Sequence, residues 1–94
     1  MDFDYSEWTG ARCVVNLDAM DRDPKLIALK ERIGSGIRQR RSKLNVSQEA
    51  LAHDAGLAVS YVSQIERGKR NPSVGALFRL CTVLQFDIAD LFRT

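Results

Sequence analysis

Helix start and stop signals divide residues 24–92 into short segments, and this limits the fold more than any other feature of the chain. Asp23-Pro24 places an acid at a cap position and proline at the first helical position. Ser47 and Ser73 are each suited to cap a further helix, and Gly56 is suited to end one in the left-handed conformation. These start and stop signals predict short helices joined by tight turns.

The apolar residues of the first segment recur at helical spacing. They stand three, four or seven residues apart: Leu26, Leu29, Ile33, Ile37 and Leu44. Gly34 and Gly36 interrupt this segment at a cost of about 1 kcal/mol each, so it forms either a bent helix or two pieces. No segment after residue 24 shows the alternation that is typical of a strand.

Further helices are predicted along the rest of the chain. The second follows Ser47, and the third has Tyr61, Val62 and Ile65 on its apolar side and stops at Gly68. A fourth helix follows Ser73. A fifth, short helix is expected after the cap residue Asp87. Asp90 stands at its reciprocal capping position, and its apolar residues are Ile88, Leu91 and Phe92. We therefore predict an all-α body of five helices.

The N-terminal segment differs from this body in pattern and charge. We interpret residues 1–23 as a non-helical arm, with a short β-type run at Cys13-Val14-Val15, and residues 24–94 as one domain. Residues 1–24 have six acids against two arginines, a net charge of −4, and residues 25–94 have twelve basic residues against six acids, a net charge of +6. A basic body suits a polyanionic partner, although a solvated basic surface would have the same composition.

Several classes of function are excluded by composition. No apolar run approaches the roughly 18 residues of a membrane span, and the acidic, aromatic N-terminus is unlike a signal peptide, so we expect a cytoplasmic protein without a membrane partner. Cys13 and Cys81 belong to no metal-type cluster and are interpreted as structural, so no metal site and no cofactor are expected. His53, the only histidine, has no catalytic constellation around it, and we expect no enzyme activity.

Residues 33–92 resemble a known family along their whole length. The Ser-Gln pair at 47–48, Leu51-Ala52, Gly56, the run IERGKRNPS and the closing DLF stand where the Cro/C1-type (XRE) helix-turn-helix domain of phage repressors and bacterial regulators has them. The resemblance implies a lambda-repressor-like fold whose third helix enters the major groove of double-stranded DNA. It also implies a homodimeric transcription regulator, similar to Cro-like repressors and especially to the small controller proteins of restriction-modification systems.

The third helix has the composition of a base-reading helix. Its outward side is short, polar and neutral, as is suitable for hydrogen bonds to base edges. The resemblance implies base reading by Val59, Ser60 and Gln64, and Ser63 is a further candidate. Gln64 is suited to adenine and Val59 to a thymine methyl group. Taken alone, the same side is also compatible with an ordinary solvent-facing helix.

Cationic and amide side chains next to this helix are candidates for phosphate contacts, which position a protein on DNA and make binding salt-dependent. The predicted set is Gln48, Arg38, Arg40, Lys43, Arg67, Lys69, Arg70 and Asn71. For Gln48 the resemblance implies both a phosphate contact and a brace for the recognition helix, and local capping is the alternative. A solvated charge run is the alternative for the others.

Two residues are assigned to the scaffold rather than to DNA. The resemblance places Arg41 and Glu66 as a partly buried ion pair that joins the first helix to the end of the third. A guanidinium–carboxylate fork fixes orientation better than lysine would. Ala58 departs from the family pattern, which has Ser or Thr at this cap, and the loss costs about 1 kcal/mol.

The end of the chain is the predicted dimer interface. Four large apolar residues are crowded there: Phe86, Ile88, Leu91 and Phe92. A two-fold contact at this place would put two recognition helices on one face of the duplex, and the operator would be an inverted repeat. Two alternatives are that these residues only seal the core of the monomer, or that the N-terminal arm forms the interface.

A second function also fits the sequence. The acidic, aromatic arm would suit a basic protein partner, as in an antitoxin that binds a partner protein and regulates its own gene. In an activator, Glu49 and Asp54 on the second helix are candidate contacts to RNA polymerase. Met20 is a candidate natural start, because residues 20–94 alone resemble a complete small regulator.

Overall fold

The computed structural model describes residues 22–92, and every regular element in this part of the chain is helical. The elements are α3 (Pro24–Lys43), α4 (Gln48–Ala55), α5 (Val59–Glu66), α6 (Val74–Val83) and the 3-10 helix η2 (Ile88–Leu91). The prediction of an all-α body is confirmed for these residues. The arm predicted for 1–23, with its run at 13–15, lies outside the described residues except for its last two positions, and remains a prediction.

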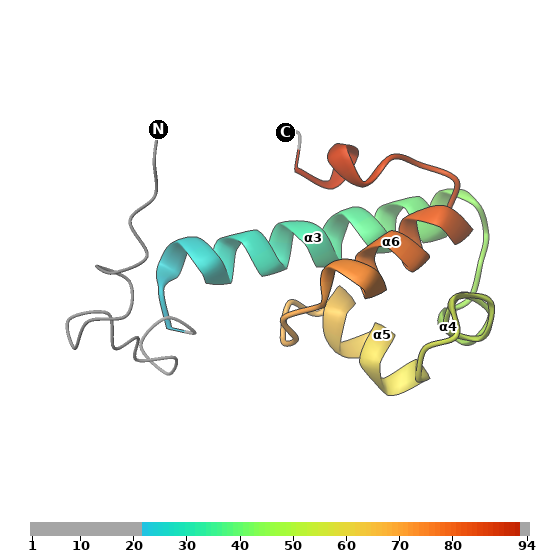
Figure 1. Ribbon diagram of the computed structural model, residues 1–94, viewed down its shortest axis with the longest axis horizontal. Coiled ribbons are helices and arrows are strands. Elements are labelled where there is room, and N and C mark those ends of the chain that lie inside the picture. Colours follow the sequence, from blue (N-terminus) through green and yellow to red (C-terminus); the bar gives the residue numbers. More distant parts are fainter. Residues whose placement is uncertain (1–21, 93–94) are drawn as a thin grey trace, which may run out of the picture.

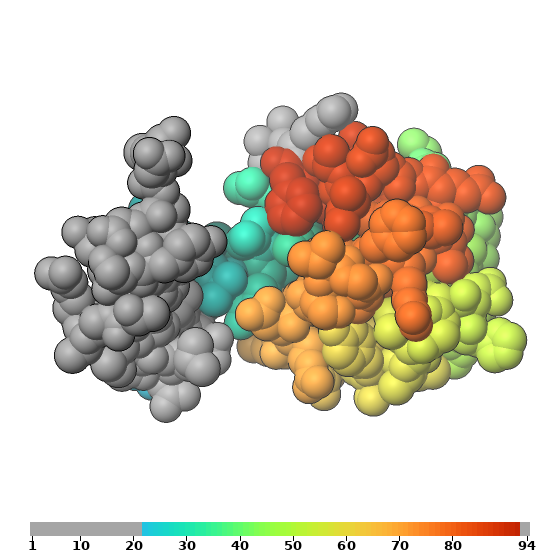
Figure 2. All heavy atoms as spheres, viewed as in Figure 1, coloured from blue at the N-terminus to red at the C-terminus, as the bar shows by residue number. Residues whose placement is uncertain are grey.

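The longest helix, α3, extends across the molecule and serves as the platform for the others (Figure 1). Helix α5 and the turn η2 both contact α3, while α4 contacts α5 and α6. In the space-filling view, α6 and η2 cover the upper part of the visible face, and α4 and α5 lie below them (Figure 2). The short helices are therefore held around one common centre.

That centre is a small aliphatic core to which every element contributes. Its largest fully buried side chains are Ile37, Leu51, Val62, Ile65, Leu80 and Leu84. Cys81, at 3% exposure, packs among them, and burial raises the pKa of its thiol to about 11, with smaller contributions from Asp87 and Asp90. Within the described residues, no helix is both long enough and apolar enough to cross a membrane.

The predicted caps are present at the starts of all the elements for which they were expected. The side chains of Asp23, Ser47, Ser73 and Asp87 accept hydrogen bonds from backbone N–H groups two or three residues further on, at 2.8 to 3.0 Å. Gly56 ends α4 with φ 70°, in the left-handed region. These signals are local in sequence, and for that reason the helix boundaries could be predicted well.

Two expectations about helix number and continuity need correction or completion. The predicted count of five helices is not confirmed: the short element after Asp87, Ile88–Leu91, is a 3-10 turn rather than an α-helix, and Phe92 N donates to the Ala89 oxygen at its end. A segment of four residues is too short to form a stable α-helix, and the turn ends at Leu91, whose side chain lies in the core. The first segment, by contrast, is one continuous helix through Gly34 and Gly36.

Candidate nucleic-acid interface

Helix α5 separates a buried side from an outward side. Val62 and Ile65 are 0% and 1% exposed and form part of the core, and Tyr61 packs partly buried against it. Val59 and Ser60 are exposed at the start of the helix, and both lie within its first turn. Ser63 and Gln64, which were also predicted to read bases, are half-buried.

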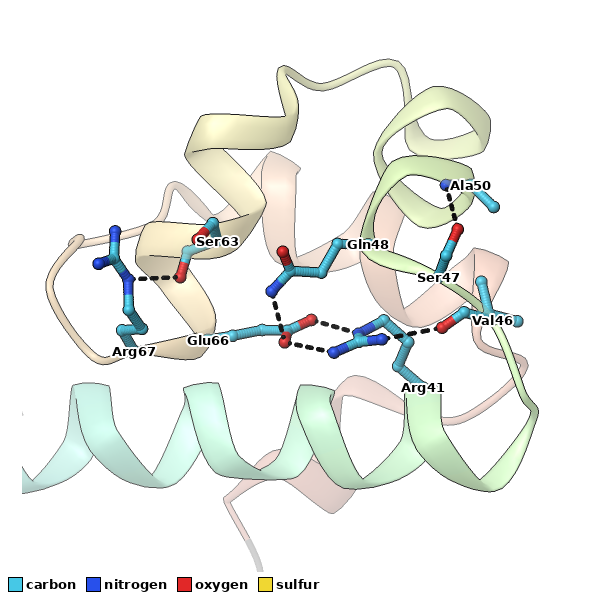
Figure 3. A network of polar contacts seen from close by, with 8 residues as sticks. All are labelled: Arg41, Val46, Ser47, Gln48, Ala50, Ser63, Glu66 and Arg67. Atoms are coloured by element: carbon cyan, nitrogen blue, oxygen red, sulfur yellow. Dashed lines mark hydrogen bonds and ion pairs between the residues drawn. The ribbon is translucent and has the colours of Figure 1, made fainter.

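The C-terminal end of α5 is fixed by a carboxylate that three side-chain donors approach. Arg41 Nε donates to Glu66 Oε2 at 2.7 Å, and Arg41 Nη2 donates to Glu66 Oε1 at 2.9 Å (Figure 3). Gln48 Nε2 donates to the same Oε1 at 3.0 Å. The Glu66 side chain is only 1% exposed, and that of Arg41 is 17% exposed. Helices α3, α4 and α5 are thus joined at one buried group.

The guanidinium of Arg41 is stabilised in its charged form. The hydrogen bond to Glu66, opposed by burial, raises the pKa of Arg41 above its ordinary value, so the guanidinium keeps its proton. Arg41 Nη1 also donates to the Val46 oxygen at 3.0 Å, which holds the turn between α3 and α4. A bidentate fork with this further bond sets the orientation of both helices. The residues assigned to a structural ion pair are therefore brought together.

Gln48 stands at the first position of α4 and reaches across to α5 (Figure 3). Its amide nitrogen contacts Glu66, so it has the bracing position that the resemblance implied. The cap of α4 is supplied instead by Ser47, whose hydroxyl accepts from Ala50 N at 3.0 Å. A contact between Gln48 and a phosphate remains a prediction.

A close backbone approach, not recognised in the sequence, brings α3 directly against the end of α5. A Cβ atom added at Gly34 would lie 2.3 Å from the Ile65 oxygen and 2.7 Å from the Glu66 oxygen. No side chain can be accommodated at such distances without movement of the backbone. The glycine that seemed to interrupt α3 is in fact what allows α5 to pack there.

The loop after α5 is held in a defined shape and exposes its cations. Gly68 has φ 72°, and the N–H of Lys69 donates to the Gln64 oxygen at 2.9 Å. The Tyr61 hydroxyl accepts from Ser73 N at 3.2 Å and thereby closes the loop onto α5. The loop residues predicted to contact phosphates are all exposed: Arg67, Lys69, Arg70 and Asn71.

Arg70 lies back over α5 rather than extending away from it. Its guanidinium carbon is 5.1 Å from the centre of the Tyr61 ring, and its Nη1 donates to Gln64 Oε1 at 3.5 Å. Arg67 makes a different contact, from its Nε to the Ser63 backbone oxygen at 3.4 Å (Figure 3). The cations of the loop are therefore continuous with the outward side of α5.

The three basic residues predicted on α3 have different environments. Arg38 and Lys43 are exposed. Arg40 differs from the expectation of a phosphate contact, because its Nε donates to the Leu84 oxygen at 2.9 Å and its Nη2 to the Gln85 oxygen at 3.0 Å. It also lies 5.7 Å from the centre of the Phe86 ring. Arg40 thus satisfies the carbonyl groups at the end of α6.

The apolar residues at the end of the described chain are only partly available to a partner. Leu91 is 3% exposed and belongs to the core, which differs from its expected place in an interface. Phe86 and Ile88 are half-buried against the same core, and Phe92 is 46% exposed. Among the described residues, the most exposed aromatic is Phe78 on α6, at 64%.

Among the described residues, no three His, Cys, Asp or Glu side chains lie close enough together to hold a metal ion. What the structure does assemble is a short polar helix face, a fixed carboxylate behind it and a cationic loop beside it. This combination is chemically suited to hydrogen bonds with base edges and to charge-assisted bonds with phosphates.

Comparison with known proteins agrees with this geometry. Residues 37–91 match the helix-turn-helix family HTH_3. The control protein C.SmaI of Serratia marcescens is 32% identical over 71 residues, which cover 76% of this chain and 84% of the relative. Two uncharacterised HTH-type transcriptional regulators of Mycobacterium tuberculosis are 38% identical over 59 residues, but the chain spans only 42% of their length.

Solved structures show the same fold. The restriction-modification controller protein C.AhdI of Aeromonas hydrophila aligns with a TM-score of 0.67 and 38% identity, over 69% of this chain and 98% of the other. The biofilm master regulator SinR of Bacillus subtilis, solved in complex with DNA, aligns with a TM-score of 0.62 and 39% identity, over 65% of this chain and 98% of the other.

Proposed function

Because the chain belongs to the helix-turn-helix family HTH_3, with HTH-type transcriptional regulators among its relatives, we propose that it binds specific DNA sites as a homodimer and regulates transcription. The observation that carries this proposal is the outward side of α5, where small polar side chains adjoin a loop of exposed cations. An α-helix with such a side fits the major groove, whose base edges present distinct donors and acceptors.

In this proposal the residues divide into two functional sets. Val59, Ser60, Ser63 and Gln64 read bases. The phosphate contacts come from Gln48, Lys43, Arg38, Arg67, Lys69, Arg70 and Asn71, whereas Arg40 is removed from this set because it holds the end of α6. The first set determines which sequence is bound, and the second supplies affinity that falls as salt concentration rises.

Selection of bound sites from random DNA, followed by affinity measurements on the selected site, tests this division. Gln64→Ala is expected to lose about 1–3 kcal/mol on the selected site and to relax the preference at one base pair. Lys69→Ala is the matched control, expected to weaken binding to all sequences alike and to reduce the salt slope by about 0.9. Equal losses of Gln64→Ala on selected and random DNA would contradict the base-reading role.

The homodimer is proposed to form through the turn after α6, with Phe92 at its centre and Phe86 and Ile88 beside it. An exposed phenylalanine next to half-buried apolar residues favours an interface. A two-fold contact there would separate the recognition helices by about 34 Å, so that the operator is an inverted repeat with half-sites about ten base pairs apart.

Sedimentation at micromolar concentration distinguishes this interface from others. Phe92→Asp is expected to give folded monomers, whereas Phe78→Asp, which places the same charge on the exposed aromatic of α6, is expected to leave the dimer intact. A folded Phe92→Asp variant that remains dimeric would contradict the proposed interface. Monomers with Phe78→Asp alone would place the interface on α6.

A restriction-modification controller is the most specific form of this proposal. It is supported by the similarity to C.SmaI and to C.AhdI, each of which this chain covers over more than four fifths of its length. Such a protein would bind near its own promoter, and exposed acids on α4, Glu49 and Asp54, are then candidate contacts to RNA polymerase. Transcription from the chromosomal region upstream of the gene, with and without Glu49→Ala and Asp54→Ala, would separate activation from repression.

A further inference from the structure

The amide oxygen of Gln64 faces the guanidinium of Arg70. Arg70 Nη1 donates to Gln64 Oε1 at 3.5 Å, and the guanidinium lies over the Tyr61 ring with its carbon 5.1 Å from the ring centre. Stacking on an aromatic ring restricts a guanidinium in position and plane. The oxygen of the amide is therefore turned toward the cation and its nitrogen away from it.

The loop that contains Arg70 is itself fixed on both sides. The Tyr61 hydroxyl accepts from Ser73 N at 3.2 Å, and Lys69 N donates to the backbone oxygen of Gln64 at 2.9 Å. A Cβ atom at Gly68 would lie 3.1 Å from Glu31 Cα, so the turn packs tightly against α3. Arg70 thus reaches Gln64 from a short, braced loop.

This arrangement has a consequence for base recognition. A free glutamine pairs with adenine by accepting from N6 and donating to N7, and both ends of the amide are needed. With its oxygen directed to a cation, Gln64 offers mainly its two N–H donors. The positive charge of Arg70 next to them disfavours the N6 amino group of adenine and favours guanine, whose N7 and O6 are both acceptors.

We propose that Arg70 is a positioning residue for base recognition, and that by holding the amide of Gln64 it makes this glutamine select guanine rather than adenine. The inference rests on the proposed function and adds the identity of one base to it. It also gives Arg70 a role beyond the phosphate contact for which its charge alone would qualify it.

Selection of sites from random DNA by the full chain, followed by sequencing, tests the proposal with the wild type and three variants. Gln64→Ala identifies the base pair that Gln64 governs, as the one where preference is lost. The wild type is expected to select guanine at this pair. Arg70→Lys keeps the positive charge but lacks the planar, stacked fork, and is expected to reduce the preference for guanine over adenine by about tenfold.

Arg67→Lys is the matched control, because Arg67 contacts the Ser63 backbone and not a base-reading side chain. It is expected to lower affinity without a change in the selected base. Adenine at the Gln64 pair in the wild type, no pair that depends on Gln64, or an unchanged preference in Arg70→Lys would each overturn the inference while leaving specific DNA binding in place. A wild type that selects no sequence would overturn the proposed function as well.

Discussion

The two ends of α5 are built in opposite ways. At its C-terminal end, Glu66 accepts three hydrogen bonds from Arg41 and Gln48 and is almost fully buried. At its N-terminal end, Ala58 provides no side-chain cap, and Val59 and Ser60 are exposed. One helix of eight residues therefore has one end fixed by a buried ion pair and one end without a side-chain cap.

The difference indicates how orientation and adaptability are divided along one short helix. The fixed end sets the direction in which α5 leaves the core, because its contacts come from two other helices. If α5 reads bases as proposed, its uncapped end is the end that would adjust by small movements as base edges are approached. We expect the fixed end to dominate stability, and the uncapped end to be the place where stability can be gained.

The largest effect is expected from breaking the ion pair. Glu66→Ala leaves the partly buried guanidinium of Arg41, whose side chain is 17% exposed, without its carboxylate, and the free energy of unfolding should fall by about 3 kcal/mol, the lower end of the range for fully buried pairs. A double-mutant cycle with Arg41→Met, measured by denaturant unfolding, should show clear coupling, because removal of both charges leaves neither one stranded.

Glu49→Ala is the matched control for that experiment, since Glu49 is an exposed carboxylate on the neighbouring helix α4. Its effect should stay within about 0.5 kcal/mol. Additive losses for Arg41 and Glu66 would mean that the carboxylate does not serve as the common point of the three helices.

An intermediate loss of stability is expected from adding a side chain where α3 contacts the fixed end of α5. Gly34→Ala introduces a Cβ atom that would lie 2.3 Å from a backbone oxygen, so the two helices must separate. We expect a loss of about 1–3 kcal/mol in the free energy of unfolding, together with weaker DNA binding because α5 is displaced.

Gly75→Ala on α6 is the control for this substitution. The nearest atom to a Cβ atom there is Ser73 Oγ at 4.0 Å, so alanine fits and should add about 0.5 kcal/mol through helix propensity. If Gly34→Ala were as stable as Gly75→Ala, the close approach would not constrain the position of α5.

The smallest change in stability is expected at the uncapped end of α5, and it is the only one of the changes around α5 that increases stability. The backbone of Ala58, with φ −70° and ψ 142°, is close to that of Ser47 and Ser73, which do cap their helices. Ala58→Thr should therefore stabilise the protein by about 1 kcal/mol, measured by thermal unfolding, and slow amide exchange at Ser60 and Tyr61.

Ala58→Val has nearly the shape of Ala58→Thr but offers no hydroxyl, and serves as its control. The gain is expected for threonine alone. Equal stability of the two variants would show that a side-chain cap does not stabilise the start of α5. The difference in stabilisation between the two ends of the helix would then be smaller than we infer.

The same contrast explains which parts of the structure could be predicted from the sequence. Caps such as Ser47 and Ser73 act on N–H groups within three residues, and the outward side of α5 follows from helical spacing, so both can be recognised locally. Arg40 could not be assigned in this way, because the carbonyl groups it holds are 44 and 45 residues distant. The charge of Arg40 suggested a phosphate contact, whereas packing places its guanidinium against the carbonyl groups at the end of α6.

Gly34 and Leu91 were misjudged for a related reason. A glycine inside a helical pattern is read as a local cost, and only the packed structure shows that the Ile65 and Glu66 oxygens require it. Leu91 belongs to a run whose hydrophobicity favours an interface, but the 3-10 turn directs this one side chain into the core. Contacts between distant segments decided both cases.

The carboxylate of Glu66 has a consequence for how such a protein could acquire new targets. All of its donors come from α3 and α4, and none comes from Val59, Ser60 or Ser63. These three residues can therefore be substituted together while the hydrogen bonds that orient α5 are kept. Randomisation of the three codons in an unchanged background should yield a library of folded proteins with altered operator choice, a starting point for orthogonal genetic switches.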